Sequence, residues 1–259
     1  MPELPSLEIF KQYFDSTSLN QEIKEININN PEILFDISEN NIKELVNRYF
    51  VSSSRYGKYL FASTSDNKFL IFHFGMTGFF KYHPKNEGIN PHSRISFLFK
   101  NGNVLDFDDS RKFGKISISE NISDFINKKN LGPDALEISL SSFKKLFKRR
   151  SGHIKPLLIN QQFLAGIGNL YADEILFQSG IHPLKKADQI ENDEQNKLYD
   201  NMVWVLKKAI EVNDSPRNFP ENFLLAHRYP KGECPNGEKL DIIKVGGRTT
   251  YYCPNKQKL

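Results

Sequence analysis

The hydrophobic pattern of the chain changes its period at about residue 125, and this change limits the possible folds more than any other feature. Before that point, short apolar runs such as KFLIFHFGMTGFFKYH and RISFLFKNGNVLDF are broken by turn residues, which is typical of β-strands. After it, apolar residues recur at helical spacing, as in NDEQNKLYDNMVWVLKKAIEVN. A sheet-forming half followed by a helical half predicts an α+β protein.

We predict three parts on this basis. Residues 1–125 form a β-sandwich with one leading helix, because SLEIFKQYFD has apolar residues at helical spacing and Ser6 is a candidate N-cap. Residues 126–225 form a helical domain, and residues 226–259 form a terminal β-hairpin. A chain of 259 residues with 39% hydrophobic content is long enough to bury real cores in such a division.

Composition also argues against several classes of protein. No run approaches eighteen apolar residues, and the start, MPELPSLEIF, has neither a basic nor an apolar signal region. We therefore expect a cytoplasmic protein that does not associate with a membrane. Two cysteines do not make a disulfide framework, and in the cytosol we expect them to be reduced thiols.

The positive charge of the chain is local rather than general. The net charge is only +4, but residues 228–259 hold seven Lys or Arg against three Asp or Glu. A second stretch, SFKKLFKRRSGHIK, has six basic residues and no acidic one. The two patches favour a polyanionic partner, although the second could also be an ordinary solvated helix face.

The first chemical motif is at the N-terminus. Removal of Met1 would expose a secondary amine at Pro2. The pKa of an α-amino group is near 7.7–8.0, so roughly a tenth or more of it is neutral at pH 7. Such an amine can attack a sugar aldehyde carbon, and Glu3 beside it could shuttle protons. Met-Pro-Glu by itself is a common start of a chain.

The second motif is GIGNLYADEILFQSGIHP, residues 166–183. A Gly-x-Gly-Asn turn that opens a helix presents backbone N–H groups and the Asn169 amide to an anion such as a phosphate. Lys155 lies upstream and could add positive charge.

The third motif is the terminal hairpin. Its tip, KVGGRTTYY, offers two glycines for a tight turn and Arg248 as a projecting cation. Cys234 and Cys253 each open a zinc-ribbon pattern, but Gly237 and Lys256 stand where the second ligand of each pair would be. A structural zinc site normally has four protein ligands, so we expect a hairpin held by strand pairing, without metal.

Together, these motifs resemble those of the formamidopyrimidine-DNA glycosylase and endonuclease VIII family of base-excision repair enzymes. The resemblance covers nearly the whole chain in register: PELP, RYGKYL, HFGMTG, DSRKFG, LGPDAL, IKPLLINQQFLAGIGNLYADEILFQSGIHP and the hairpin. It implies an N-terminal catalytic β-sandwich, a helix–two-turn–helix domain at 126–225 and a zincless finger at 226–259.

The resemblance also implies an activity and its residues. The protein would be a bifunctional DNA glycosylase and AP lyase that excises oxidised bases through a Schiff base and cleaves the strand by β/δ-elimination. Pro2 would be the nucleophile and Glu3 the acid/base, with Lys58 near the damaged nucleotide. The partner would be double-stranded DNA with oxidised bases or abasic sites, bound by a monomer that uses no cofactor.

Two further groups of residues are implied by the same resemblance. The residues that would bind DNA phosphates are Asn169, Arg248 and Lys155. The residues that would fill the void left by a flipped nucleotide are Met76, Arg111 and Phe113. The second group suits a protein that extrudes a nucleotide, because inserted side chains restore part of the lost stacking.

Several alternatives stay open at this point. The short connection VNDSPRNFPENFLLA argues against a strong preference for 8-oxoguanine, whereas the Met-Arg-Phe trio resembles the purine-specific branch. Ser6 stands where the family usually has an acid. A binding-only damage sensor would use the same residues without the nucleophile. A metal-dependent nuclease would need clustered ligands, for which only Asp106, Asp108 and Asp109 are candidates.

Overall fold

The computed structural model of the protein describes residues 1–88, 90–148 and 150–259. These residues form two compact units. The first contains Met1–Pro2 and Ser6–Asn130, and the second contains Glu3–Pro5 and Leu131–Leu259. Arg149, one of the six basic residues of the second basic stretch, lies outside the described residues.

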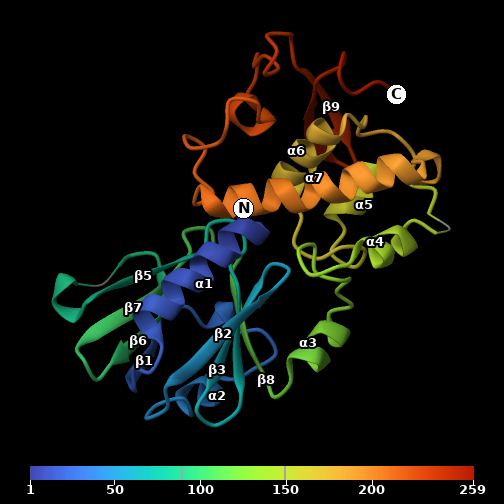
Figure 1. The fold of residues 1–259 in the computed structure, drawn as a ribbon. Coiled ribbons are helices and arrows are strands. Elements are labelled where there is room, and N and C mark those ends of the chain that lie inside the picture. The colour runs from blue at the N-terminus through green and yellow to red at the C-terminus, as the bar shows by residue number, and fades with distance from the viewer. Residues whose placement is uncertain (89, 149) are drawn as a thin grey trace. The chain divides into compact units, whose positions relative to one another are not determined.

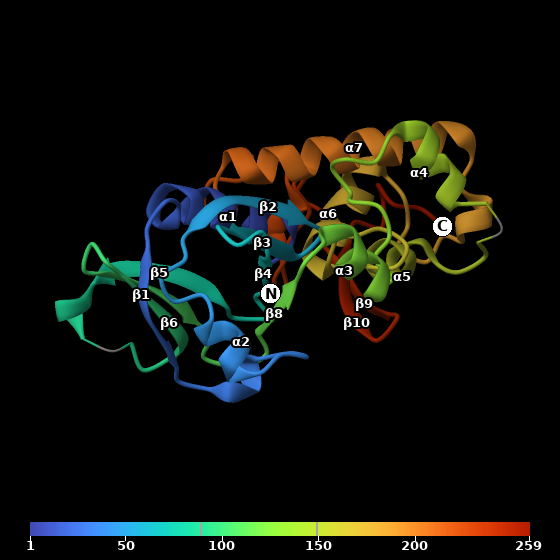
Figure 2. The ribbon, with the colours of Figure 1, turned by 90° about the horizontal axis from the view of Figure 1, so that it is seen from below.

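The first unit contains two four-stranded antiparallel sheets, which Figures 1 and 2 show in blue to green. One sheet has the order β1-β6-β7-β5, with β1 (Ile23–Ile28), β5 (Phe79–Pro84), β6 (Ser93–Phe99) and β7 (Asn103–Asp108). The other has the order β2-β3-β4-β8, with β2 (Phe50–Tyr56), β3 (Tyr59–Thr64), β4 (Phe69–His73) and β8 (Lys115–Ser119). The predicted sheet-rich N-terminal half is therefore confirmed.

Aromatic side chains fill the space between the two sheets. Phe72 of β4 and Phe107 of β7 are fully buried, and their rings stack with centroids 5.9 Å apart. Phe72 also meets Phe97 of β6 edge-on at 6.4 Å. Rings that face one another from opposite sheets each remove a large apolar area from water, which makes this the core of a β-sandwich.

Helix α1 (Leu4–Ser18) covers one end of the sandwich. Its Phe14 is buried and touches Phe50 of one sheet at 5.1 Å and Phe80 of the other at 5.5 Å between ring centroids. The expected helix is present, but the expectation of an N-cap at Ser6 is wrong, because the helix begins two residues earlier. Proline is tolerated in a first helical turn, so Pro5 does not prevent this earlier start.

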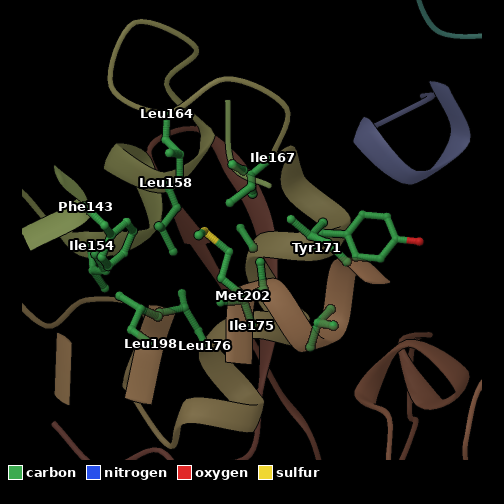
Figure 3. Packing of buried hydrophobic residues seen from close by; sticks show 14 of the residues in the cluster. Phe143, Ile154, Leu158, Leu164, Ile167, Tyr171, Ile175, Leu176, Leu198 and Met202 are labelled. Carbon is green, nitrogen blue, oxygen red and sulfur yellow. The ribbon is translucent and has the colours of Figure 1, made fainter. Parts of the chain in front are cut away.

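The second unit is helical until its last hairpin. Its α-helices are α4 (Leu140–Leu146), α5 (Ile154–Ile159), α6 (Asn169–Ser179) and α7 (Asn192–Glu211). In Figure 3 the buried faces of α6 and α7 meet around Ile175, Leu198 and Met202. Because α7 buries residues at helical spacing while α6 is buried almost throughout, α6 is the central helix of this unit.

Shorter helices complete the two units. They are α2 (Glu39–Lys43), α3 (Ile122–Lys128), η1 (Pro31–Ile33), η2 (Lys85–Glu87), η3 (Ala187–Gln189) and η4 (Leu224–His227). Within the described ranges, none of the helices is both long and apolar enough to span a membrane.

The terminal hairpin pairs β9 (Asp241–Val245) with β10 (Arg248–Tyr252) in antiparallel register, and it lies beside α5 and α6 (Figure 2). Gly246 and Gly247 have φ values of 56° and 74°, which suits the tight two-residue turn that the sequence predicts. We call residues 226–259 the finger. The expectation of two reduced thiols in it is wrong: Cys234 and Cys253 form a disulfide with a Cα–Cα distance of 5.9 Å.

We predict that this disulfide stabilises the finger. It closes a loop across a sequence separation of 19 residues, for which loop-closure entropy gives about 3 kcal/mol. Replacing both cysteines by Ser should therefore speed hydrogen exchange in β9 and β10. If strand pairing alone held the finger, the same substitution would leave the exchange rates unchanged. Amides of α7 serve as the internal control. Titration of two free thiols in unfolded, unreduced protein would contradict the disulfide.

Candidate functional site

The Glu3 carboxylate caps the N-terminus of α6. It accepts hydrogen bonds from the backbone N–H groups of Gly168 at 2.6 Å, Leu170 at 2.9 Å and Tyr171 at 3.3 Å. Glu3 is only 3% exposed, and the N–H of the next residue, Leu4, donates to the Gly166 carbonyl at 3.0 Å. A carboxylate at a helix N-terminus meets both free N–H groups and the positive end of the helix dipole.

The two glycines of the Gly-x-Gly turn make this contact possible. A Cβ at Gly168 would lie 2.4 Å from the Glu3 carboxyl carbon, and one at Gly166 would lie 2.5 Å from the Leu4 side chain. We expected the N–H groups of this turn to hold a phosphate, and for Gly168 that expectation is corrected: its N–H, together with those of Leu170 and Tyr171 in the first turn of α6, binds the protein's own carboxylate.

Asn169, the first residue of α6, joins this helix to the finger. Its Nδ2 donates to the carbonyl oxygen of Thr249 at 3.0 Å, directly after Arg248 in β10. The Asn169 Oδ1 atom is buried without a hydrogen-bond partner, while Arg248 is exposed beside the turn of the hairpin. The structure therefore brings two of the three predicted phosphate-binding residues to neighbouring positions.

Lys155, the third of these residues, is in a different environment. Its side chain is completely buried, with Nζ 2.6 Å from Asp173 Oδ1 and 2.7 Å from Thr250 Oγ1. Because burial leaves the ammonium no surface on which to meet a phosphate, the expectation of a direct contact by Lys155 is corrected. This burial was not evident from the sequence, because Lys155 follows the exposed Lys145, Lys148 and Arg150 in the same basic stretch.

In the first unit, Lys58 lies in the tight turn between β2 and β3 and is 8% exposed. His73, at the end of β4, is close enough to Lys58 to feel its charge. Burial, together with the charges of Lys58 and Lys129, lowers the pKa of His73 to about 4, so its ring is neutral at pH 7. Gly75 N–H donates to Nδ1 at 3.3 Å, which leaves the ring proton on Nε2. His73 was not identified from the sequence, although it opens HFGMTG.

Met76, Arg111 and Phe113 come from two loops of the first unit and are all exposed. The Arg111 guanidinium lies 5.0 Å from the centre of the Phe113 ring. The loops touch so closely that a Cβ at Gly75, where φ is +60°, would lie 2.5 Å from the Phe113 carbonyl carbon. Only glycine permits this approach, which holds the two loops against each other.

Asp109 joins the same two loops through hydrogen bonds to its buried carboxylate. Its Oδ1 accepts the Thr77 hydroxyl at 2.5 Å and the Arg111 N–H at 3.2 Å, and its Oδ2 accepts the Gly114 N–H at 2.6 Å. The residue is 1% exposed. Asp109, a candidate metal ligand by sequence, is therefore the residue that positions the Arg111 backbone.

The other two aspartates of this segment also bind protein groups. Asp106 accepts from Ser93 and Ser96 and faces His83 at 2.9 Å, while Asp108 accepts from Asn90. In the part of the chain that the structure describes, no three His, Cys, Asp or Glu side chains gather where they could hold a metal ion. The three aspartates are therefore structural groups with separate partners.

Pro2 precedes Glu3 and is partly buried, whereas Met1 is 56% exposed. Met1 is thus accessible to solvent, while Glu3 is fixed on α6.

Both units match known domains of one protein family. Residues 131–220 match the helix–two-turn–helix (H2TH) domain of formamidopyrimidine-DNA glycosylase, which defines the class of the second unit. Residues 1–116 match the N-terminal domain of the same proteins. The chain belongs to the formamidopyrimidine-DNA glycosylase family, which confirms the resemblance of its motifs.

Individual relatives match over the full chain. The formamidopyrimidine-DNA glycosylase of Mycoplasma mobile is 32% identical over 274 residues and covers 100% of both chains. That of Arabidopsis thaliana is 31% identical, over 100% of this chain and 71% of its own. The solved complex of Lactococcus lactis Fpg with abasic-site DNA has a TM-score of 0.90 at 27% identity, covering 99% of this chain and 100% of that one.

We predict that Asp109→Ala destabilises the first unit. The substitution leaves the buried Gly114 N–H without its acceptor and frees the Thr77 hydroxyl, and each such loss costs about 1–3 kcal/mol. The free energy of unfolding, measured by chemical denaturation, should fall by at least about 2 kcal/mol. The neighbouring exposed Ser110→Ala is the matched control. Equal stability of the two variants would show that Asp109 does not hold the loops.

Proposed function

We propose that this chain is a bifunctional DNA glycosylase and AP lyase that excises oxidised bases from double-stranded DNA and then cleaves the strand. The observation that carries the proposal is the docking of Glu3 on α6, because it links the start of the chain to the helix that begins with Asn169. The relatives named formamidopyrimidine-DNA glycosylase, and the complex of one of them with abasic-site DNA, support this substrate class.

The chemistry begins at Pro2 once Met1 has been removed. The neutral amine nitrogen attacks C1′ of the damaged nucleotide and releases its proton to Glu3 or to water, and the glycosidic bond breaks as the base leaves with the bonding electrons and takes up a proton. Opening of the sugar at O4′ gives an iminium ion between Pro2 and C1′. Elimination of the 3′ phosphate and then the 5′ phosphate cleaves the strand, and hydrolysis of the iminium restores the amine.

Glu3 is the group that we assign to proton transfer. It follows Pro2 in the chain, so it is within reach of a sugar bound to that nitrogen, and its carboxyl is held in one orientation by three N–H groups. General acid-base help of this kind is worth about 10²–10⁴-fold in rate. Glu3 would protonate the departing base or O4′.

The remaining site residues bind and distort the DNA in this proposal. Asn169 and the exposed Arg248 would hold the phosphates, and Lys58 would lie near the damaged nucleotide. The exposed Met76, Arg111 and Phe113 would fill the void, which offsets an unstacking cost of a few kcal/mol.

One chain provides every residue that this mechanism uses, and we propose that the protein acts as a monomer. Residues 1–125 would supply the catalytic part, residues 126–225 the DNA-binding helices and residues 226–259 the finger. A substrate in chromosomal DNA would place the protein in the cytoplasm of a bacterium or the nucleus of a eukaryote.

The covalent step gives a direct test. Borohydride should trap the wild-type protein on oligonucleotides that carry an abasic site, dihydrothymine, a hydantoin or 8-oxoguanine, whichever it accepts. Pro2→Gly with Met1 retained should abolish trapping, because no secondary amine is available to form the iminium. Intact mass establishes the N-terminus of each sample, and binding to tetrahydrofuran-containing DNA is the control. Undiminished trapping in the variant would remove Pro2 from the mechanism.

Glu3→Gln should separate chemistry from binding. An amide keeps one oxygen for the α6 N–H groups but cannot donate a carboxylic proton, so base excision should fall by about 10²–10⁴-fold. Binding to tetrahydrofuran-containing DNA should change by no more than a few-fold. Glu8→Gln, which removes only an ion pair to Arg55, is the matched control. Excision within a few-fold of wild type would assign proton transfer to another group.

A further inference from the structure

Asp173 is a buried carboxylate at the junction of α6 and the finger. Its side chain is not exposed, its Oδ1 lies 2.6 Å from Lys155 Nζ, and its Oδ2 accepts from Arg228 Nε at 2.8 Å. One carboxylate thus lies between two cations in the interior of the second unit. Burial raises the pKa of Asp173 and lowers that of Lys155, and the ion pair between them opposes both shifts.

The groups of this cluster bind three consecutive residues of β10. Lys155 Nζ donates to Thr250 Oγ1 at 2.7 Å, and Asp173 Oδ2 accepts the Tyr251 N–H at 3.3 Å. Arg228 Nη2 donates to the Thr249 carbonyl at 3.4 Å, where the Asn169 amide also binds. The strand that begins with Arg248 is therefore held from α5, from α6 and from Arg228 near the start of the finger.

A buried ion pair of this kind adds little to the free energy of folding, but it favours one position of the strand that it binds. Taking charges from water is costly, but once they are buried, a shift of the strand would leave a charge without a partner. An apolar contact would tolerate such a shift, because it has no direction. The cluster is therefore suited to fixing the register of β10 on α6.

We propose that Asp173, Lys155 and Arg228 form a positioning centre for the finger, which sets where Arg248 and Asn169 meet a DNA phosphate. Lys155 then affects DNA binding only through β10 and not by touching the DNA. The proposal rests on the proposed function of Arg248 and Asn169, and it assigns a role to Asp173 that the reaction itself does not use.

A double-mutant cycle tests this indirect role. Lys155→Met keeps all but the last atom of the side chain's length and removes its charge, and Arg248→Ala removes the proposed phosphate contact. We expect Lys155→Met to weaken binding to tetrahydrofuran-containing DNA at least tenfold alone, and several-fold less than that in the Arg248→Ala background, where only the Asn169 contact is left to displace. Equal weakening in both backgrounds, with the salt slope lowered by about one each time, would show a direct contact and overturn the proposal.

Hydrogen exchange tests the positioning without DNA. Amides of β9 and β10 should exchange faster in Lys155→Met, while those of α7 stay unchanged. If that variant does not fold, Thr250→Val removes the hydroxyl that accepts from Lys155 and donates to the Arg248 carbonyl, and it should have the same local effect. Unchanged exchange in the finger would overturn the proposal. If exchange rises but Arg248→Ala binds DNA like wild type, the positioning centre stands and the phosphate role of Arg248 fails.

Discussion

The hydrogen bonds between the Glu3 carboxylate and the N-terminus of α6 are the contact on which the candidate site depends. They use the N–H groups on both sides of Asn169, so they fix the first residue of the helix as well as the start of the chain. A charged group at a helix N-terminus typically contributes about 0.3–1 kcal/mol, and up to about 2 kcal/mol when partly buried. The glycines at 168 and 166 make room for the start of the chain, because a larger residue would collide with Glu3 at the first and with Leu4 at the second.

Both units use a buried aspartate beneath exposed residues. Asp109 holds the loops that present Arg111 and Phe113, and Asp173 holds the strand that presents Arg248. In each case, the exposed residues are free to meet a ligand while their backbone is fixed by charge-assisted hydrogen bonds. A loop whose backbone is anchored in this way loses less conformational entropy when a ligand binds than a flexible loop does.

The finger is held by a disulfide, hydrogen bonds and ion pairs, whereas a zinc ribbon is held by one metal ion. The disulfide joins the segments around Cys234 and Cys253. Gln257 accepts the Cys253 N–H at 2.9 Å and donates to the Ile181 carbonyl at 2.9 Å, which attaches the end of the chain to the segment after α6. Together with the ion pairs of Asp173, these bonds hold the hairpin from different sides.

The sequence by itself determined the order of sheet and helices, the leading helix, the hairpin and the motifs that carry Asn169, Arg248 and the exposed loops. These features follow from periodicity and from local turn chemistry, which act over a few residues. Only the tertiary structure decided what distant groups do. Glu3 takes the N–H groups of a turn 165 residues away, Lys155 is buried rather than exposed, and the two cysteines pair. Local pattern cannot give these outcomes, because burial and long-range partners determine whether a charged group binds a ligand or holds the fold.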